Sequence, residues 1–114
     1  MNFYFIVPGA VVNLQIQSMS STWIMVSWSI PVNVECQPVS YTVEHELTNI
    51  DQCFQVTNGQ IIPVDTTSDL SYSVTGLTSY STYTVYVTPR TGAVNGIRSG
   101  VPGTTEQTGD CYFV

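Results

Sequence analysis

The chain has 114 residues, of which 43% are hydrophobic and only 9% are charged. Its formal net charge is −6, and its two basic residues are Arg90 and Arg98. Because nucleic acids and anionic membranes are bound through clustered cations, this composition excludes a nucleic-acid partner and disfavours an anionic membrane surface. The length indicates one domain.

No apolar run approaches the roughly 20 residues that a transmembrane helix needs, so we expect no membrane insertion within this chain. Residues 1–7 are apolar, but they lack a basic region and are followed by Pro8 and Gly9. They therefore make a poor signal peptide. Secretion would then be encoded upstream, or the mature product would begin near this point.

Short runs of β-prone residues, separated by Pro, Gly, Asn and Ser, predict an all-β sandwich, because convincing helical periodicity is absent. Seven strands are expected in chain order, at about residues 11–17, 22–29, 40–47, 53–57, 71–75, 82–88 and 97–105. Since side chains alternate between the two faces of a strand, parity predicts the core. It comprises Leu14, Ile16, Ile24, Val26, Trp28, Tyr41, Val43, Phe54, Val56, Tyr72, Val74, Leu77, Tyr83, Val85 and Val87.

The stretch from Gly76 to Val87 carries the strongest local signal. The turn-forming Gly76 and Leu77 are followed by Tyr83, which opens a strict alternation of apolar and polar residues. A tyrosine in this place can bury its ring and hydrogen-bond through its hydroxyl to the backbone of the preceding turn. This arrangement is the tyrosine corner of β-sandwiches.

Taken together, these motifs resemble the pattern of a fibronectin type III domain. The resemblance is carried in chain order by Pro8, Leu14, Trp28, Pro31, Tyr41, Val43, Leu77 and Tyr83. Ser79 and Ser81 depart mildly from the family, which usually has Pro and Thr there. The resemblance covers residues 8–107 and implies a seven-stranded fibronectin type III-like β-sandwich, with a structural corner formed by Leu77, Tyr83 and Trp28. An immunoglobulin domain is disfavoured because no Cys lies on the second strand or two residues after Tyr83.

The same resemblance implies an extracellular, non-catalytic structural or adhesive module with protein partners. A more specific hypothesis is head-to-tail self-assembly into an extracellular fibre, in which the partners are copies of the chain itself. The alternatives are one repeat of a larger cell-surface receptor, or an accessory module of a secreted carbohydrate-active enzyme. The integrin-binding Arg-Gly-Asp signal of the family is absent. We expect neither a cofactor nor a small-molecule substrate, because no nucleophile–base pair or facing carboxylates are apparent.

Three cysteines, Cys36, Cys53 and Cys111, are too far apart for a zinc motif, and His45 is the single histidine. Loops of the expected sandwich gather at two poles, with Cys53 and Cys111 at one and Cys36 at the other. The favoured pairing is therefore Cys53 with Cys111, which leaves Cys36 spare. Two alternatives stay open: Cys111 bonded to Cys36 of the next unit, or three reduced thiols.

The candidate interaction residues are outward-facing or terminal apolar groups, namely Phe3, Phe5, Val7, Trp23, Tyr112 and Phe113. The apolar tails, residues 1–7 and 108–114, either pack on their own domain or add a strand to the open sheet edge of a neighbour. His45 is expected at the edge of the core or at the surface. The acidic residues match no calcium loop, so we assign no catalytic, cofactor-binding or metal-binding residue.

Overall fold

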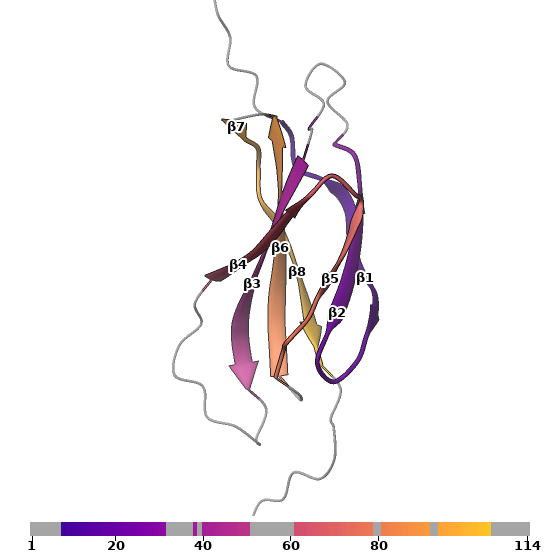
Figure 1. Cartoon of the computed structure of the whole chain (residues 1–114), viewed down its shortest axis with the longest axis vertical. Coiled ribbons are helices and arrows are strands. Elements are labelled where there is room, and N and C mark those ends of the chain that lie inside the picture. The colour runs from indigo at the N-terminus through magenta and orange to yellow at the C-terminus, as the bar shows by residue number, and fades with distance from the viewer. Residues whose placement is uncertain are drawn as a thin grey trace, which may run out of the picture.

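The computed structural model describes residues 8–31, 38, 40–50, 61–78, 81–91 and 94–105. Over these residues the chain forms two antiparallel sheets that pack face to face (Figure 1). The strands are β1 (Val12–Met19), β2 (Ile24–Ser29), β3 (Ser40–Ile50), β4 (Ile61–Thr67), β5 (Ser71–Val74), β6 (Ser81–Thr91), β7 (Val94–Asn95) and β8 (Ser99–Thr104). One sheet has the order β1-β2-β5; the other has the order β4-β3-β6-β7, with β8 also paired to β6. The predicted all-β sandwich is confirmed.

Two strands differ from the sequence prediction, and the described part of the chain has eight strands rather than seven. The strand expected at 53–57 lies outside the described residues, while β4 follows it and pairs with β3. The periodicity of β4 is hidden by Pro63, which interrupts the apolar run. The last predicted strand, 97–105, begins later, because Ile97 lies between β7 and β8 and is 59% exposed.

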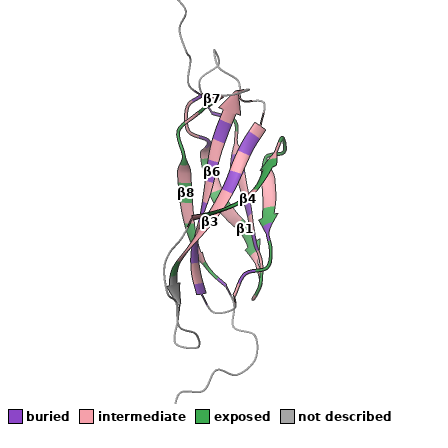
Figure 2. Cartoon of the chain, turned by 60° about the vertical axis from the view of Figure 1, so that its left-hand side comes forward, coloured by how far each residue is buried: buried purple, intermediate pink, exposed green. Residues whose placement is uncertain are grey.

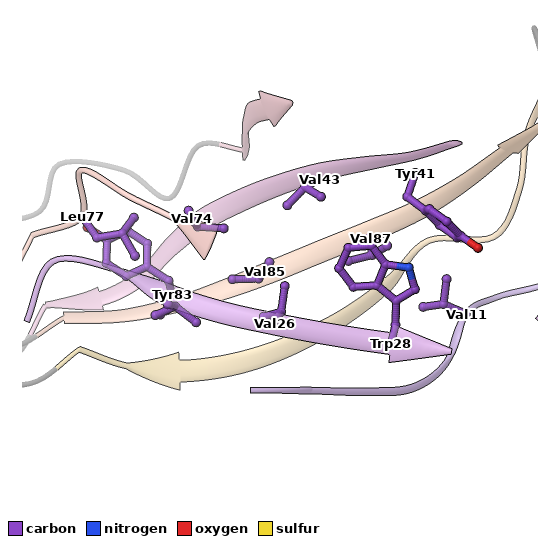
Figure 3. Packing of buried hydrophobic residues seen from close by; sticks show 11 residues of the cluster. Val11, Val26, Trp28, Tyr41, Val43, Val74, Leu77, Tyr83, Val85 and Val87 are labelled. Atoms are coloured by element: carbon purple, nitrogen blue, oxygen red, sulfur yellow. The ribbon is translucent and has the colours of Figure 1, made fainter. Parts of the chain in front are cut away.

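The core lies between the sheets and is built from alternate residues of the central strands. Burial alternates along β6 and over residues 40–43 of β3, as the coloured bands of Figure 2 show. Figure 3 shows the buried apolar cluster, which comprises Val11, Ile24, Val26, Trp28, Tyr41, Val43, Val74, Leu77, Tyr83, Val85 and Val87. Of these only Val11 was not predicted. Burying each large side chain contributes about 1.5–3 kcal/mol.

The remaining core predictions are partly met. Leu14, Ile16 and Tyr72 are half-buried and pack against the cluster. Phe54 and Val56 lie outside the described residues. At one end of the core, the rings of Trp28 and Tyr41 meet edge to face, with their centroids 5.4 Å apart and their planes at 61°. This edge-to-face geometry adds a favourable interaction energy to the energy that the rings gain from burial.

The predicted tyrosine corner is present at the other end of the core, formed by Leu77 and Tyr83. Trp28, which the sequence also assigned to the structural corner, lies instead at the Tyr41 end. The Thr78 backbone N–H donates to the Tyr83 hydroxyl oxygen over 2.8 Å, and the Tyr83 ring is 4% exposed. The turn that precedes Tyr83 needs a residue with positive φ, and Gly76 supplies it with a φ of 70°. Glycine adopts this conformation without steric cost. The next residue, Leu77, donates its backbone N–H to the Thr22 carbonyl over 2.9 Å. The corner therefore joins β5, β6 and the turn before β2.

Candidate interaction surfaces

The sequence candidates fall into two groups. The cysteines and the terminal apolar residues lie outside the described residues, namely Cys36, Cys53, Cys111, Phe3, Phe5, Val7, Tyr112 and Phe113. Their disulfide and docking roles stay predictions. Trp23 is described, and it lies half-buried just before β2, where its carbonyl accepts a hydrogen bond from the Ser20 N–H over 2.9 Å. Trp23 thus keeps part of its ring accessible for a contact.

The N-terminal pole, where β2 ends and β5 begins, is held closed by a contact between the start of the domain and the segment after β7. The Ile97 N–H donates to the Pro8 carbonyl over 3.3 Å, and the Gly96 N–H donates to the Pro89 carbonyl over 2.6 Å. A Cβ atom on residue 96 would lie 2.5 Å from the Pro8 oxygen, so glycine alone allows this crossing. The contact fixes the point at which the chain enters the sandwich.

The C-terminal pole, which carries the tyrosine corner, is held by Thr105. This residue is 2% exposed, and its backbone N–H donates to the Ser81 carbonyl over 2.9 Å. Its hydroxyl accepts from the Ser81 N–H over 2.9 Å and donates to the Thr78 carbonyl over 2.8 Å. Sequence reasoning missed Thr105 because no local periodicity marks a residue that acts across the sheet. Trp23, next to Thr22 of the corner, lies at this same pole.

The N-terminal pole also carries exposed apolar side chains. Ile30, Leu70 and Ile97 are 46%, 40% and 59% exposed. All three belong to this pole, because Ile30 follows β2, Leu70 accepts from the Trp28 N–H, and Ile97 donates to Pro8. Three exposed apolar side chains at one pole make this pole a candidate contact surface, whereas single exposed apolar residues need no explanation.

The sheet edges are protected against pairing with another strand. Edge strands β4 and β8 contain Pro63 and Pro102, each of which removes a backbone donor. Edge strand β1 has two register shifts against β2, and edge strand β5 has only four residues. Addition of a strand from a neighbour is therefore disfavoured at the edges that the structure describes, and the poles are the more open surfaces.

The outer face of the five-stranded sheet is polar and contains a hollow of about 280 Å³. It is lined by Thr42 and Glu44 of β3, Thr88 and Arg90 of β6, and Asn95 of β7. Beside it, the Tyr86 hydroxyl donates to Glu46 over 2.7 Å, and the Arg98 guanidinium carbon lies 4.2 Å from the centre of the Tyr86 ring. The hydrogen bond to Glu46 is the main cause that raises the pKa of Tyr86.

His45 lies at the edge of the core, one of the two positions that the sequence predicted. Its ring meets Tyr83 edge to face at 5.6 Å, and its Nδ1 atom is buried without a hydrogen-bond partner. Burial lowers the pKa of this imidazole below its ordinary value of 6.5. The flanking Glu46 is on the opposite face, so it gives His45 no acidic partner. Within the described residues, no group of His, Cys, Asp and Glu side chains could hold a metal ion.

No helix among the described residues is long and apolar enough to cross a membrane. The profile of the fibronectin type III domain matches residues 9–106. No curated protein matches the chain. Solved structures that share the fold include a fibronectin type III domain of a human protein called fibronectin type III domain containing protein 3. The two are 19% identical with a TM-score of 0.73, and the match covers 95% of this chain and 94% of that one.

Two further structures share the fold as parts of longer chains. A multi-domain titin fragment is 16% identical with a TM-score of 0.71, over 89% of this chain but only 33% of the fragment. Domains d3 and d4 of the extracellular region of rat CD45 are 19% identical with a TM-score of 0.71, over 88% of this chain and 51% of that one. The chain therefore spans one domain of such fragments.

Proposed function

Because the chain belongs to the fibronectin type III family, whose members are typically non-catalytic modules that mediate protein–protein contacts, we propose that it is an extracellular structural or adhesive module that joins its neighbours end to end. The observation that carries this proposal is the pair of anchors at opposite poles. Pro8 lies beside Pro89 near the end of β6. Thr105 is hydrogen-bonded to Ser81 at the beginning of β6. These two points are eight residues apart on one extended strand, or about 26 Å at 3.3 Å per residue.

Because the two anchors lie at opposite poles, the sandwich would act as a spacer between the segments that precede and follow it. A chain that enters at one pole and leaves at the other extends a row of domains. The hydrogen bonds at Ile97 and Thr105 would then transmit tension into the sheet rather than into a loop. The rat CD45 fragment, which has the same fold, comes from an extracellular region, and this supports an extracellular site of action.

Self-assembly is the more specific part of the proposal. The exposed Ile30, Leu70 and Ile97 of one copy would pack against the C-terminal pole of the next, where Trp23 is half-exposed. The contact is heterologous, since two different surfaces meet, and such contacts propagate into a filament unless the rotation closes a ring. The protected sheet edges favour this polar stacking over the addition of strands.

Light scattering after size exclusion tests the self-assembly. The mass should rise with protein concentration, both with and without reductant, because the contact is apolar rather than covalent. Ile97→Ser should lower the mass at a given concentration. Ile62→Ser is the matched control, because Ile62 is 47% exposed but lies on β4, away from the pole. A strict monomer at high concentration would contradict the fibre and would leave a repeat within a longer protein as the role of the module.

A further inference from the structure

The hollow on the outer face of the five-stranded sheet is not used by the end-to-end contact. Its shape follows from the register of β3 and β6, in which Ser40 lies opposite Arg90, Thr42 opposite Thr88, and Glu44 opposite Tyr86. Along the two strands, the short threonine pair therefore lies between Arg90 on one side and Glu44 on the other. The hollow therefore follows from the sheet register, in which a pair of short threonines lies between two pairs that each contain a long side chain.

The two ends of the hollow carry opposite charges. Arg90 is half-buried, and its Nε atom is buried without a hydrogen-bond partner. A buried donor without a partner favours an acceptor that can reach it. The Asn95 side chain lies beside Arg90, because the two residues pair across β6 and β7. At the other end Glu44 presents carboxylate oxygens, which are hydrogen-bond acceptors.

The surroundings of the hollow narrow the class of ligand. Tyr86 is the adjoining aromatic residue, but Arg98 covers its ring and its hydroxyl is bonded to Glu46. Arg98 thus occupies one face of the ring, and the ring also lies against Gly100, where an added Cβ would be 2.9 Å from two ring carbons. Little of the ring is left for a sugar or a nucleobase to stack on. A simple anion would use Arg90 alone, and a simple cation would use Glu44 alone. The hollow suits a ligand that carries both charges.

We propose that this hollow binds a dipolar peptide segment, with a carboxylate at Arg90 and an ammonium or guanidinium group at Glu44. Asn95 and the hydroxyls of Thr42 and Thr88 would bond the peptide groups between the two charges. The proposal rests on the proposed role of the module in protein contacts, and it names the chemistry of a lateral partner rather than of the end-to-end neighbour.

Triglycine, whose two termini carry the required charges, is the minimal probe. In an NMR titration of the whole chain, it should shift the backbone amides of Thr42, Glu44, Thr88, Arg90 and Asn95 in a saturable manner. Acetylated and amidated triglycine, acetate, methylammonium and glucose should each bind more weakly. Equal binding of acetate would reduce the hollow to an anion site. If glucose or the blocked peptide bound as tightly as triglycine, the charges of the ligand would have no role in binding. Either result would overturn the proposal, as would the absence of saturable shifts.

Substitutions locate the two charges. Arg90→Gln and Glu44→Gln should each weaken triglycine binding about two- to fivefold, the range expected for a partly exposed ion pair. Asp69→Asn, which removes an exposed carboxylate away from the hollow, should leave binding unchanged. The double variant Arg90→Glu with Glu44→Arg presents the same dipole reversed and should restore binding. Failure of the restoration would contradict the dipolar site. Light scattering reports the end-to-end contact separately, so the two proposals fail independently.

Discussion

Tyr83 and Tyr86 are three residues apart on β6, so they lie on opposite faces of the same sheet, and they have different roles. Tyr83 is buried, and its hydroxyl oxygen accepts a hydrogen bond from the turn that it closes. Tyr86 is half-buried on the outer face, where it bonds Glu46 and lies under Arg98. The inner residue is fully accounted for by packing. The outer one belongs to a polar surface that packing alone does not require.

The same contrast holds for the whole sheet. On the inner face, β3 and β6 carry fully buried apolar residues such as Val43, Val85 and Val87. On the outer face, Thr42, Thr88 and Arg90 are half-buried and polar. On the solvated face of a β-sandwich, most substitutions change the free energy of unfolding little. Function is therefore expected on the outer face and at the poles, and stability on the inner face.

The largest effect should come from the buried core that the inner face covers. Trp28→Ala removes the ring that packs on Tyr41 and leaves a cavity at that end of the core. We expect a loss of about 3–5 kcal/mol in the free energy of unfolding, measured by urea denaturation. The outer-face control Tyr86→Ala should cost less than half as much. If the two substitutions lowered the free energy of unfolding equally, the inner face would not be the main source of stability.

The corner gives a smaller and more specific test. Tyr83→Phe keeps the ring but removes the acceptor of the Thr78 N–H. The free energy of unfolding should fall by about 1–3 kcal/mol, because a part-buried donor loses its partner. In the matched variant Tyr86→Phe, the hydrogen bond that is lost lies on the solvated outer face, where water can replace it, and the loss should be smaller. A larger loss at Tyr86 would show that the polar outer face, not the corner, holds β6 in place.

The inner face could be predicted from the sequence, whereas the hollow could not, for a physical reason. Alternation along Tyr83, Val85 and Val87 is local, and it is enough to assign their side of the sheet. The hollow depends on which residues pair across strands, since Thr88 must lie opposite Thr42 and Asn95 beside Arg90. Such pairings join residues far apart in the chain, and local periodicity does not encode them. The strand β4 was missed for a local reason, because Pro63 interrupts its pattern.

His45 supplies the smallest expected effect, which depends on pH. It lies on β3 opposite Val85 of β6 and Ile62 of β4, with Tyr83 against its ring. Burial lowers its pKa in the folded state below 6.5, so the unfolded chain takes up the proton first. The contribution of neutral His45 to stability should therefore be complete above pH 6.5 and decline as the pH falls toward the lower pKa of the folded state.

This decline can be separated from other titrations. His45 is the single histidine, and carboxylates titrate mainly below about pH 5. Unfolding in urea between about pH 7.5 and 5 should show the midpoint falling for the natural chain and staying level for His45→Gln, which cannot take up a proton in this range. A midpoint that rises on acidification would mean that His45 gains an acidic partner in the folded state. Glu44 and Glu46, its neighbours in sequence, would then have to reach it from the outer face, and the separation of the two faces that explains Tyr83 and Tyr86 would fail at this position.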